Sequence, residues 1–414
     1  MMDLDEDRAI ADLRRLASFG KYETGVNRPA LSDADFAARL WLKDQMREAG
    51  LEADIDGLGT VIGRAPCARA TLLLGSHSDS VPFGGWLDGA LGVIFALAVA
   101  RARQRTHPED AIGVDVVSFA DEEGTFLACG GSRAFCGEIG REAFEGARNA
   151  AGETGLDRLN ALALSGRPLF ALDPVRQRAF LEAHIEQGPR LIEAGLNVGA
   201  VTGIVGIRRR RVRFGGRADH AGTTPMSLRE DAAKAMYAFA VAAEAALSKA
   251  SSAHSVWNLG VVNVRPGAPN VVAHEAEIVV EFRDLSTEVM ERMDAALLAL
   301  IAERDGVEGV RAASERIAAI DPTHMNEGMI ARLEAAAKTE GASCVRMQSG
   351  AGHDAMILGR RIPAAMLFVP SLGGRSHHIS EDTDEADIRR GLRVYARAAD
   401  FLLGALEANG GSAP

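Results

Sequence analysis

Imidazole and carboxylate side chains follow several apolar runs of the sequence, each at the point where the run ends. Such side chains are the ligands of borderline divalent metals such as Zn²⁺, Mn²⁺, Co²⁺ or Ni²⁺. A carboxylate among them can bridge two ions, and a second carboxylate beside a ligand can act as a general base. The positions concerned are His77, Asp88, the pair Glu122–Glu123, His184 and His377. The pattern predicts a metal centre.

Each of these residues also has an ordinary structural explanation when it is considered alone, because a single histidine is more often a surface or a satisfied core residue. That explanation must be repeated separately for every member of the set, so the set as a whole favours metal binding. Two other chemistries have no support, since the sequence contains neither a CxxC pair for thiolate zinc nor a GxSxG nucleophile motif.

Apolar patterns place these side chains at the ends of strands. Residues 71–77 form a short, wholly apolar run of the kind found in buried parallel strands, and residues 113–123 form a second run that ends in acids. Helices are expected at 32–50, with Ser32 as the N-cap, and at about 88–103. This alternation predicts an α/β fold whose mostly parallel sheet has helices on both faces and binds ligands at the carboxyl ends of its strands.

The pattern changes near residue 206. The stretch that follows predicts a strand, an alanine-rich helix at 228–248, two strands, a helix and a last strand, which is the β-α-β-β-α-β order of ferredoxin-like domains. Alternation of strands and helices then resumes. We therefore expect a discontinuous catalytic domain of residues 1–206 and 324–414, interrupted by a smaller inserted α+β domain of residues 207–323.

Composition narrows the possible partners and the location. The 414 residues carry a formal net charge of −11, which argues against nucleic acid or an anionic membrane as a partner. No stretch approaches the ~18 apolar residues of a membrane span. In the run Arg208–Arg211, strand alternation would place two arginines on each face, so we expect a solvated or interface strand rather than a phosphate track. The acidic N-terminus and four scattered cysteines are typical of a cytoplasmic protein with reduced thiols.

Six blocks of sequence, in order and spanning roughly residues 20–395, resemble one known family. The chain is similar to the dinuclear-metal amidohydrolases, which include N-carbamoyl-L-amino-acid hydrolases, allantoate amidohydrolases and β-alanine synthases. Six blocks in one order are far more specific than any single block. They are GSHSDSVPFGGWLDGALG (75–92), DEEGTF (121–126), LEAHIEQGP (181–189), GRADHAGTTPM (216–226), SGAGHDAM (349–356) and FVPSLGGRSH (368–377).

The resemblance implies two divalent metal ions per subunit, bridged by one carboxylate and served by a neighbouring carboxylate base. The implied members are the bridging Asp88, His77 and His184 on the first metal, Glu123 and His377 on the second, and the general base Glu122. The carboxylate of Asp79 is expected to orient the imidazole of His77. Two further residues, His353 and Asp354, match the family pattern without an assigned role.

The resemblance also implies how a small carboxylate-bearing substrate is held. His220 of the inserted domain is expected to stabilise the oxyanion in the active site of the partner subunit, in a homodimer formed through that domain. Asn270 and Arg283 would clamp the substrate carboxylate, and an arginine can bind a carboxylate with two hydrogen bonds. Gln187 would contact the carbamoyl or amide end, and closure of the inserted domain as a lid would expel water.

The implied reaction is hydrolysis of an N-carbamoyl-L-amino acid to ammonia, carbon dioxide and the free amino acid. Three alternatives stay open: an allantoate or other ureido-acid amidohydrolase, an N-acyl or aryl-acyl amino-acid amidase, and a catalytically silent protein that binds a small acid. The chain departs from the family in having Thr125 and Phe126 where many relatives have an arginine after the base. It also has Arg375 two residues before His377, where isoleucine is usual.

Arg375 is predicted to act in one of two ways. It either forms a salt bridge with Glu381 or Asp382, or provides a second anion site that favours N-carbamoyl or N-acyl derivatives of aspartate and glutamate. If it is an anion site, Arg375→Ile should lower kcat/KM for acidic substrates relative to aliphatic ones. An unchanged ratio in steady-state assays would assign Arg375 a structural role.

Overall fold

Two compact units make up the chain. The computed structural model describes residues 2–412, and the chain divides into one unit of Met1–Thr202 with His324–Pro414 and a second unit of Gly203–Thr323. The sequence patterns placed the corresponding boundaries after residues 206 and 323.

A nine-stranded sheet forms the centre of the first unit. Its central strands β15, β7, β5 and β6 are parallel, as expected, whereas β8 pairs antiparallel with β15, and β4 and β3 continue antiparallel from β6. From edge to edge the strands are β13 (Thr323–His324), β8 (Val198–Ile204), β15 (Ala364–Val369), β7 (Gln177–Ile185), β5 (Ala70–His77), β6 (Ile112–Phe119), β4 (Val61–Arg64) and β3 (Glu52–Ile55), with β14 (Cys344–Ser349) paired to β8.

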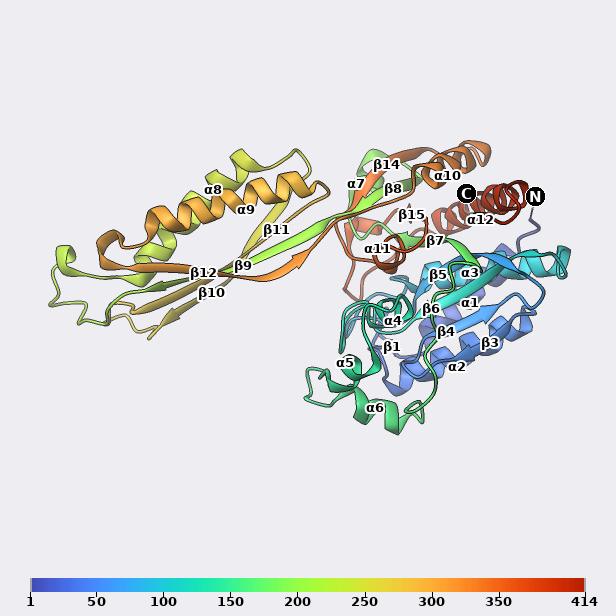
Figure 1. The fold of residues 1–414 in the computed structure, drawn as a ribbon, viewed down its shortest axis with the longest axis horizontal. Coiled ribbons are helices and arrows are strands. Elements are labelled where there is room, and N and C mark those ends of the chain that lie inside the picture. The colour runs from blue at the N-terminus through green and yellow to red at the C-terminus, as the bar shows by residue number, and fades with distance from the viewer. Residues whose placement is uncertain (1, 413–414) are drawn as a thin grey trace. The chain divides into compact units, whose positions relative to one another are not determined.

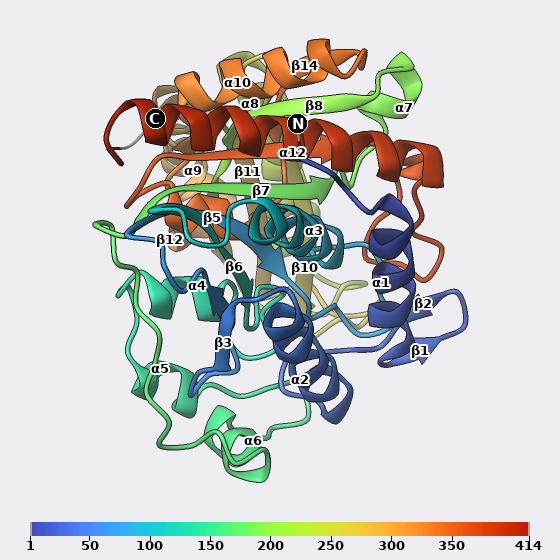
Figure 2. The same ribbon diagram turned by 90° about the vertical axis from the view of Figure 1, so that its right-hand side faces the viewer.

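Helices pack against this sheet and complete the α/β fold. Helix α3 contacts β5 and β6, and α1 packs on α3 (Figure 2). Helix α12 contacts β15. The helices of this unit are α1 (Glu6–Ser18), α2 (Asp33–Glu48), α3 (Ala90–Thr106), α4 (Gly130–Phe135), α5 (Arg141–Gly146), α6 (Gly155–Ala161), α7 (Arg190–Ala194), α10 (Glu327–Thr339), α11 (Asp354–Leu358) and α12 (Glu385–Ala408). A short hairpin of β1 (Lys21–Tyr22) and β2 (Gly25–Val26) follows α1.

Local sequence signals account for several of these boundaries. The hydroxyl of Ser32 accepts a hydrogen bond from the backbone N–H of Asp35 at 3.1 Å, so Ser32 caps α2 as predicted. Every residue of β5 is buried, as its wholly apolar run indicates. Helix α3 begins at Ala90 rather than at residue 88, because Gly89 adopts a left-handed φ of +63°.

The second unit has the predicted β-α-β-β-α-β order. Its four strands form an antiparallel sheet in the order β10-β11-β9-β12, and its two helices cover one face of that sheet (Figure 1). The elements are β9 (Gly206–Gly215), α8 (Ala232–Ala250), β10 (Val256–Arg265), β11 (Glu275–Asp284), α9 (Thr287–Arg304) and β12 (Arg311–Ile320). The ferredoxin-like arrangement is therefore confirmed.

The arginine run of β9 alternates between the two faces of this sheet. Arg208 and Arg210 are buried, and Arg210 Nη2 donates to Asp294 Oδ2 at 2.8 Å. Arg209 and Arg211 are less buried and pair with glutamates of β11 and β12. The predicted alternation, with two arginines on each face, is therefore confirmed. Arg208 and Arg210 are buried rather than solvated, because acidic side chains of the same unit compensate their charge.

Among residues 2–412, no helix combines the length and apolar character needed to cross a membrane. The four cysteines, all within this range, are free.

Candidate metal centre and active site

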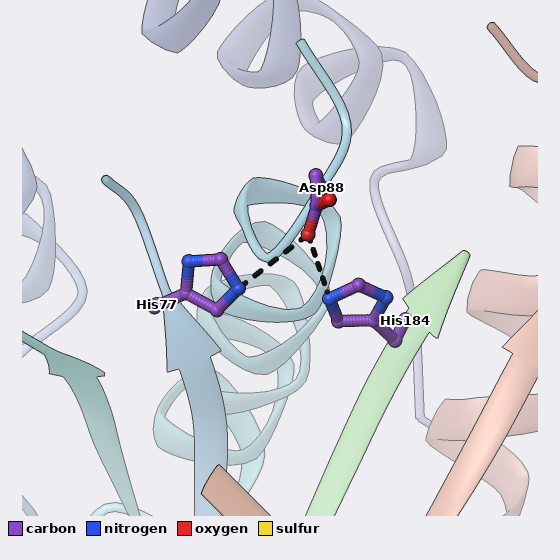
Figure 3. Close-up of side chains that lie close together, drawn as sticks. All are labelled: His77, Asp88 and His184. Carbon is purple, nitrogen blue, oxygen red and sulfur yellow. Dashed lines mark ion pairs between the residues drawn. The ribbon is translucent and has the colours of Figure 1, made fainter. Parts of the chain in front are cut away.

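The parallel strands bring two histidines together at one end of the sheet. His77 is the last residue of β5, His184 is the last but one of β7, and Asp88 lies just before α3. Asp88 Oδ1 is 3.5 Å from His77 Nε2 and 3.0 Å from His184 Nε2 (Figure 3). Because all three residues are buried and offer ligand atoms within 4.8 Å of one another, they could hold one metal ion.

A second group of ligand atoms shares the same aspartate. His377 Nε2 is 3.4 Å from Asp88 Oδ2 and 3.4 Å from Glu123 Oε2. Asp88 thus turns one oxygen toward each group, and the two groups together could hold two ions. A carboxylate divided in this way is the arrangement that a bridging ligand requires.

Main-chain carbonyls orient the two buried imidazoles. Asp79 O is 3.1 Å from His77 Nδ1, and Ile185 O is 2.9 Å from His184 Nδ1. A proton on each Nδ1 would satisfy these carbonyls and leave both Nε2 atoms free to bind metal. The sequence had assigned the first contact to the carboxylate of Asp79, but that group lies 4.0 Å away and accepts a hydrogen bond from Arg39 Nη2 at 3.2 Å.

The donor set fits divalent cations. Glu123 Oε1 and Gln187 Oε1 are buried and have no hydrogen-bond partner among the described residues. Burial, reinforced by the negative charge of Asp88, raises the pKa of Glu123 to about 7. Gln187 Nε2 donates to Asp88 Oδ2 at 2.9 Å, so its amide lies directly at the shared carboxylate. Buried oxygens without a donor are costly unless a cation satisfies them.

Glu122 lies beside the candidate metal ligands but belongs to neither group. Its Oε2 is 3.6 Å from His77 Nε2. Burial raises the pKa of Glu122 well above its usual value, against the attraction of His77, and the negative charge of Glu123 contributes to the rise. A carboxylate at the edge of a metal pocket with raised proton affinity has the properties that a general base requires.

Glu381 is a site residue that the sequence did not identify as one. Its Oε1 accepts hydrogen bonds from the backbone N–H groups of Leu87 and Asp88 at 3.1 and 3.0 Å, and its Oε2 accepts one from Ser376 Oγ at 2.8 Å. A Cβ atom on Gly85 would lie 1.9 Å from this carboxylate. The pair of glycines at 84–85 is the available signal, because it leaves room for a side chain from a distant segment.

Arg375 takes neither partner that the salt-bridge hypothesis named. It is exposed, and its Nη1 donates to Ser380 Oγ at 3.2 Å. Glu381 is buried in the loop contacts described above, and Asp382 accepts a hydrogen bond from Trp86 Nε1 at 3.3 Å. Since Arg375 is exposed, it carries no burial penalty that would require an anion.

His353 and Asp354 are both buried, and His353 contacts one of the candidate ligands. The ring of His353 packs edge-on against His184, with 4.5 Å between centroids, and its Nε2 is 2.9 Å from Ser349 Oγ. Burial, together with the charge of Glu182, raises the pKa of Asp354 to about 8. The ring of His353 therefore lies in contact with the imidazole of His184.

The predicted substrate residues of the second unit lie in two separate places. His220 pairs with Val271, and Ala221 N–H donates to Asn270 O at 3.0 Å, so His220 and Asn270 lie on facing segments beyond the Gly215↔Glu275 end of the sheet.

Arg283 lies near the opposite end of β11, where it pairs with Ile207 of β9, and its Nη2 donates to Glu281 Oε1 at 2.7 Å. Arg283 lies eight residue steps along the extended strand from Glu275, a distance of roughly 27 Å. Asn270 and Arg283 of one subunit therefore cannot clamp the same small carboxylate, which corrects the simplest form of the predicted clamp.

The chain is similar to several known proteins. The sequence profile of "Peptidase family M20/M25/M40" matches residues 73–400. An N-carbamoyl-L-amino acid amidohydrolase of Geobacillus stearothermophilus is 35% identical over 399 residues, which cover 94% of this chain and 96% of that protein. An allantoate amidohydrolase of Bacillus subtilis is 32% identical, over 92% of this chain and 93% of that protein.

A solved structure is similar over nearly the whole chain. The crystal structure of an amidase of the hydantoinase/carbamoylase family from Burkholderia phymatum superposes with a TM-score of 0.91 at 43% identity, covering 98% of this chain and 99% of that one. Both units of the present chain therefore have counterparts in that protein.

The variant Gly89→Ala tests whether the tight turn before α3 is needed to position His77 for metal binding. A Cβ atom on Gly89 would lie 2.4 Å from the ring of His77, so Gly89→Ala should displace that imidazole and reduce divalent-metal uptake at least about tenfold. Gly137→Ala is the matched control, because Gly137 has a similar left-handed φ of +71° but no described atom within 4 Å of the added carbon. Equal metal content in the two purified variants would contradict the role given to this turn.

Proposed function

Since the chain belongs to peptidase family M20/M25/M40, we propose that it is a metal-dependent amidohydrolase that cleaves the linear carbamoyl C–N bond of an N-carbamoyl-L-amino acid. The observation that carries the proposal is Asp88, whose two oxygens face two separate groups of ligand atoms, with the carboxylate of Glu122 beside them. The relatives at 32–35% identity that are named N-carbamoyl-L-amino-acid amidohydrolases support the substrate class.

Each residue of the site has a defined task in this proposal. Two divalent ions, drawn from Zn²⁺, Mn²⁺, Co²⁺ and Ni²⁺, would supply Lewis acidity that polarises the scissile carbonyl and activates a water. Glu122 removes a proton from that water and returns one to the leaving nitrogen. Gln187 orients the carbamoyl end, and His220 donates to the oxyanion. Arg283 binds the substrate carboxylate through its guanidinium.

The separation within the second unit supports a homodimer. If Arg283, Asn270 and His220 all contact one substrate, two subunits are required, because roughly 27 Å of strand lie between Arg283 and Glu275, and the other two residues lie beyond Glu275. We assign Arg283 to one subunit and the pair His220–Asn270 to its partner. Strand β10 is an edge strand with Val256, Val261 and Val262 exposed, as expected of a surface available for contact between subunits.

Allantoate hydrolysis is the second candidate function. It is favoured by the allantoate amidohydrolase of Bacillus subtilis, which is 32% identical over 92% of this chain. Both reactions cleave a linear C–N bond next to a carboxylate-bearing group, so the same metal ligands and base serve either substrate. An N-acyl amino-acid amidase and a silent acid-binding protein are the further outcomes that the assay below separates. A cytoplasmic location stays a prediction.

The proposed function is tested by turnover of N-carbamoyl, N-formyl and N-acetyl L-amino acids and of allantoate, scored for ammonia and free amine. N-carbamoyl substrates should be hydrolysed, EDTA should abolish turnover, and Mn²⁺, Co²⁺ or Zn²⁺ should restore it. Glu122→Gln should lower kcat by about 10²–10⁴ while metal content stays unchanged. Absence of turnover on the whole panel with metal-loaded enzyme would refute the proposal, and loss of metal from Glu122→Gln would make Glu122 a ligand.

Subunit complementation tests the shared site. Glu122→Gln and His220→Ala should each be inactive alone, whereas coexpressed subunits should recover up to about a quarter of wild-type activity, because half of the dimers are mixed and each mixed dimer has one complete site. Coexpression of two differently tagged Glu122→Gln chains is the control and should stay inactive. A fully active monomer in sedimentation velocity would contradict the arrangement.

A further inference from the structure

The loop between β6 and α4 holds Cys129 directly across from Glu122. The backbone N–H of Cys129 donates to Glu122 O at 2.9 Å, and that of Gly130 donates to Asp121 O at 3.0 Å. The carboxylate of Asp121 closes the loop from inside by accepting a hydrogen bond from Leu127 N–H at 2.7 Å. Main-chain hydrogen bonds therefore hold residues 122 and 129 next to each other.

The Cys129 thiol contacts one oxygen of Glu122, and the other oxygen lies near His77. Cys129 Sγ donates to Glu122 Oε1 across 3.7 Å, while Glu122 Oε2 lies 3.6 Å from His77 Nε2. Within residues 2–412, the thiol is the one group that donates a hydrogen bond to this carboxylate. One oxygen of Glu122 thus accepts a hydrogen bond from a neutral thiol, and the other lies beside the His77 imidazole.

Cys129 also adopts an unusual backbone conformation. Its φ of 52° and ψ of 34° lie in the left-handed region, which a non-glycine residue adopts at some energetic cost. Burial raises the pKa of the Cys129 thiol well above its usual value, and the charge of Glu122 contributes, so the sulfur keeps the proton that it donates. A strained residue whose side chain meets a catalytic group points to a role in placing that group.

We propose that Cys129 is a positioning residue, whose thiol holds Glu122 Oε1 so that Oε2 points at the water to be deprotonated. The proposal rests on the proposed function, because it takes Glu122 as the general base. A glutamate side chain has three rotatable bonds, and without a donor on Oε1 it would distribute among several orientations of its carboxylate. The chemical step would slow, since general-base catalysis depends on placement of the accepting oxygen, while substrate binding would be unaffected.

The test compares Cys129→Gly, Cys129→Ala and Cys129→Ser with Cys136→Ala as the matched control. Cys136 is also a half-buried free cysteine and lies at the other end of α4, with Glu138 and Arg361 as its charged neighbours instead of a catalytic group. Glycine suits the left-handed backbone, so Cys129→Gly removes the thiol without adding strain and should fold as well as wild type.

Cys129→Gly and Cys129→Ala should lower kcat about tenfold, with KM, metal content and melting temperature unchanged. Cys129→Ser, which restores a donor, should recover to within about threefold of wild type, and Cys136→Ala should match wild type. The inference is overturned if Cys129→Gly keeps the kcat of Cys136→Ala, or if metal content or melting temperature falls in step with kcat. A wild-type enzyme without turnover would instead refute the proposed function itself, so the two failures are distinguishable.

Discussion

The first unit brings several buried or partly buried carboxylates close together at one end of its sheet. Burial raises the pKa of Glu123 to about 7, and burial with the nearby Asp88 raises that of Glu381 to about 7. Burial opposes ionisation of Asp88 as well, but the imidazoles of His184, His377 and His77 outweigh it and hold its pKa well below the usual range. Divalent cations bound between these carboxylates would compensate their negative charge. The arrangement of the loops is consistent with such binding.

Two buried arginines form hydrogen bonds with the segment that follows β5. Arg39 is fully buried and donates to Asp79 at 3.2 Å and to Asp35 at 2.8 Å. Arg28 is also buried and donates to Ser78 O at 2.6 Å. Both fix the segment that follows β5, and neither forms an ion pair with Asp88. The two arginines therefore stabilise the loop without neutralising the carboxylate of Asp88, which stays available to bind a cation.

The grouping of the candidate metal ligands could be predicted because their residue types are chemically specific and strand ends are readable from apolar runs, whereas metal binding itself stays a prediction. His77, His184 and Asp88 converge since parallel strands end at one edge. The contact of the Asp79 carbonyl with His77 could not be found in this way, because it depends on the main-chain conformation of the loop. Glu381 could not be found because it contacts a loop almost three hundred positions away in the sequence. The ferredoxin-like order was readable from alternating patterns, but the separation of Asn270 from Arg283 required the strand register.

Metal stoichiometry is the most direct measurement of the central claim that Asp88 is shared by two ions. Metal-loaded wild-type protein, freed of excess metal by gel filtration, should contain two equivalents per chain by mass spectrometry of the metal. Asp88→Ala should lose both equivalents together, whereas His377→Ala should lose mainly one, because His377 serves only the second group. A single equivalent in wild type, or an Asp88→Ala variant that keeps one ion at full affinity, would contradict the account.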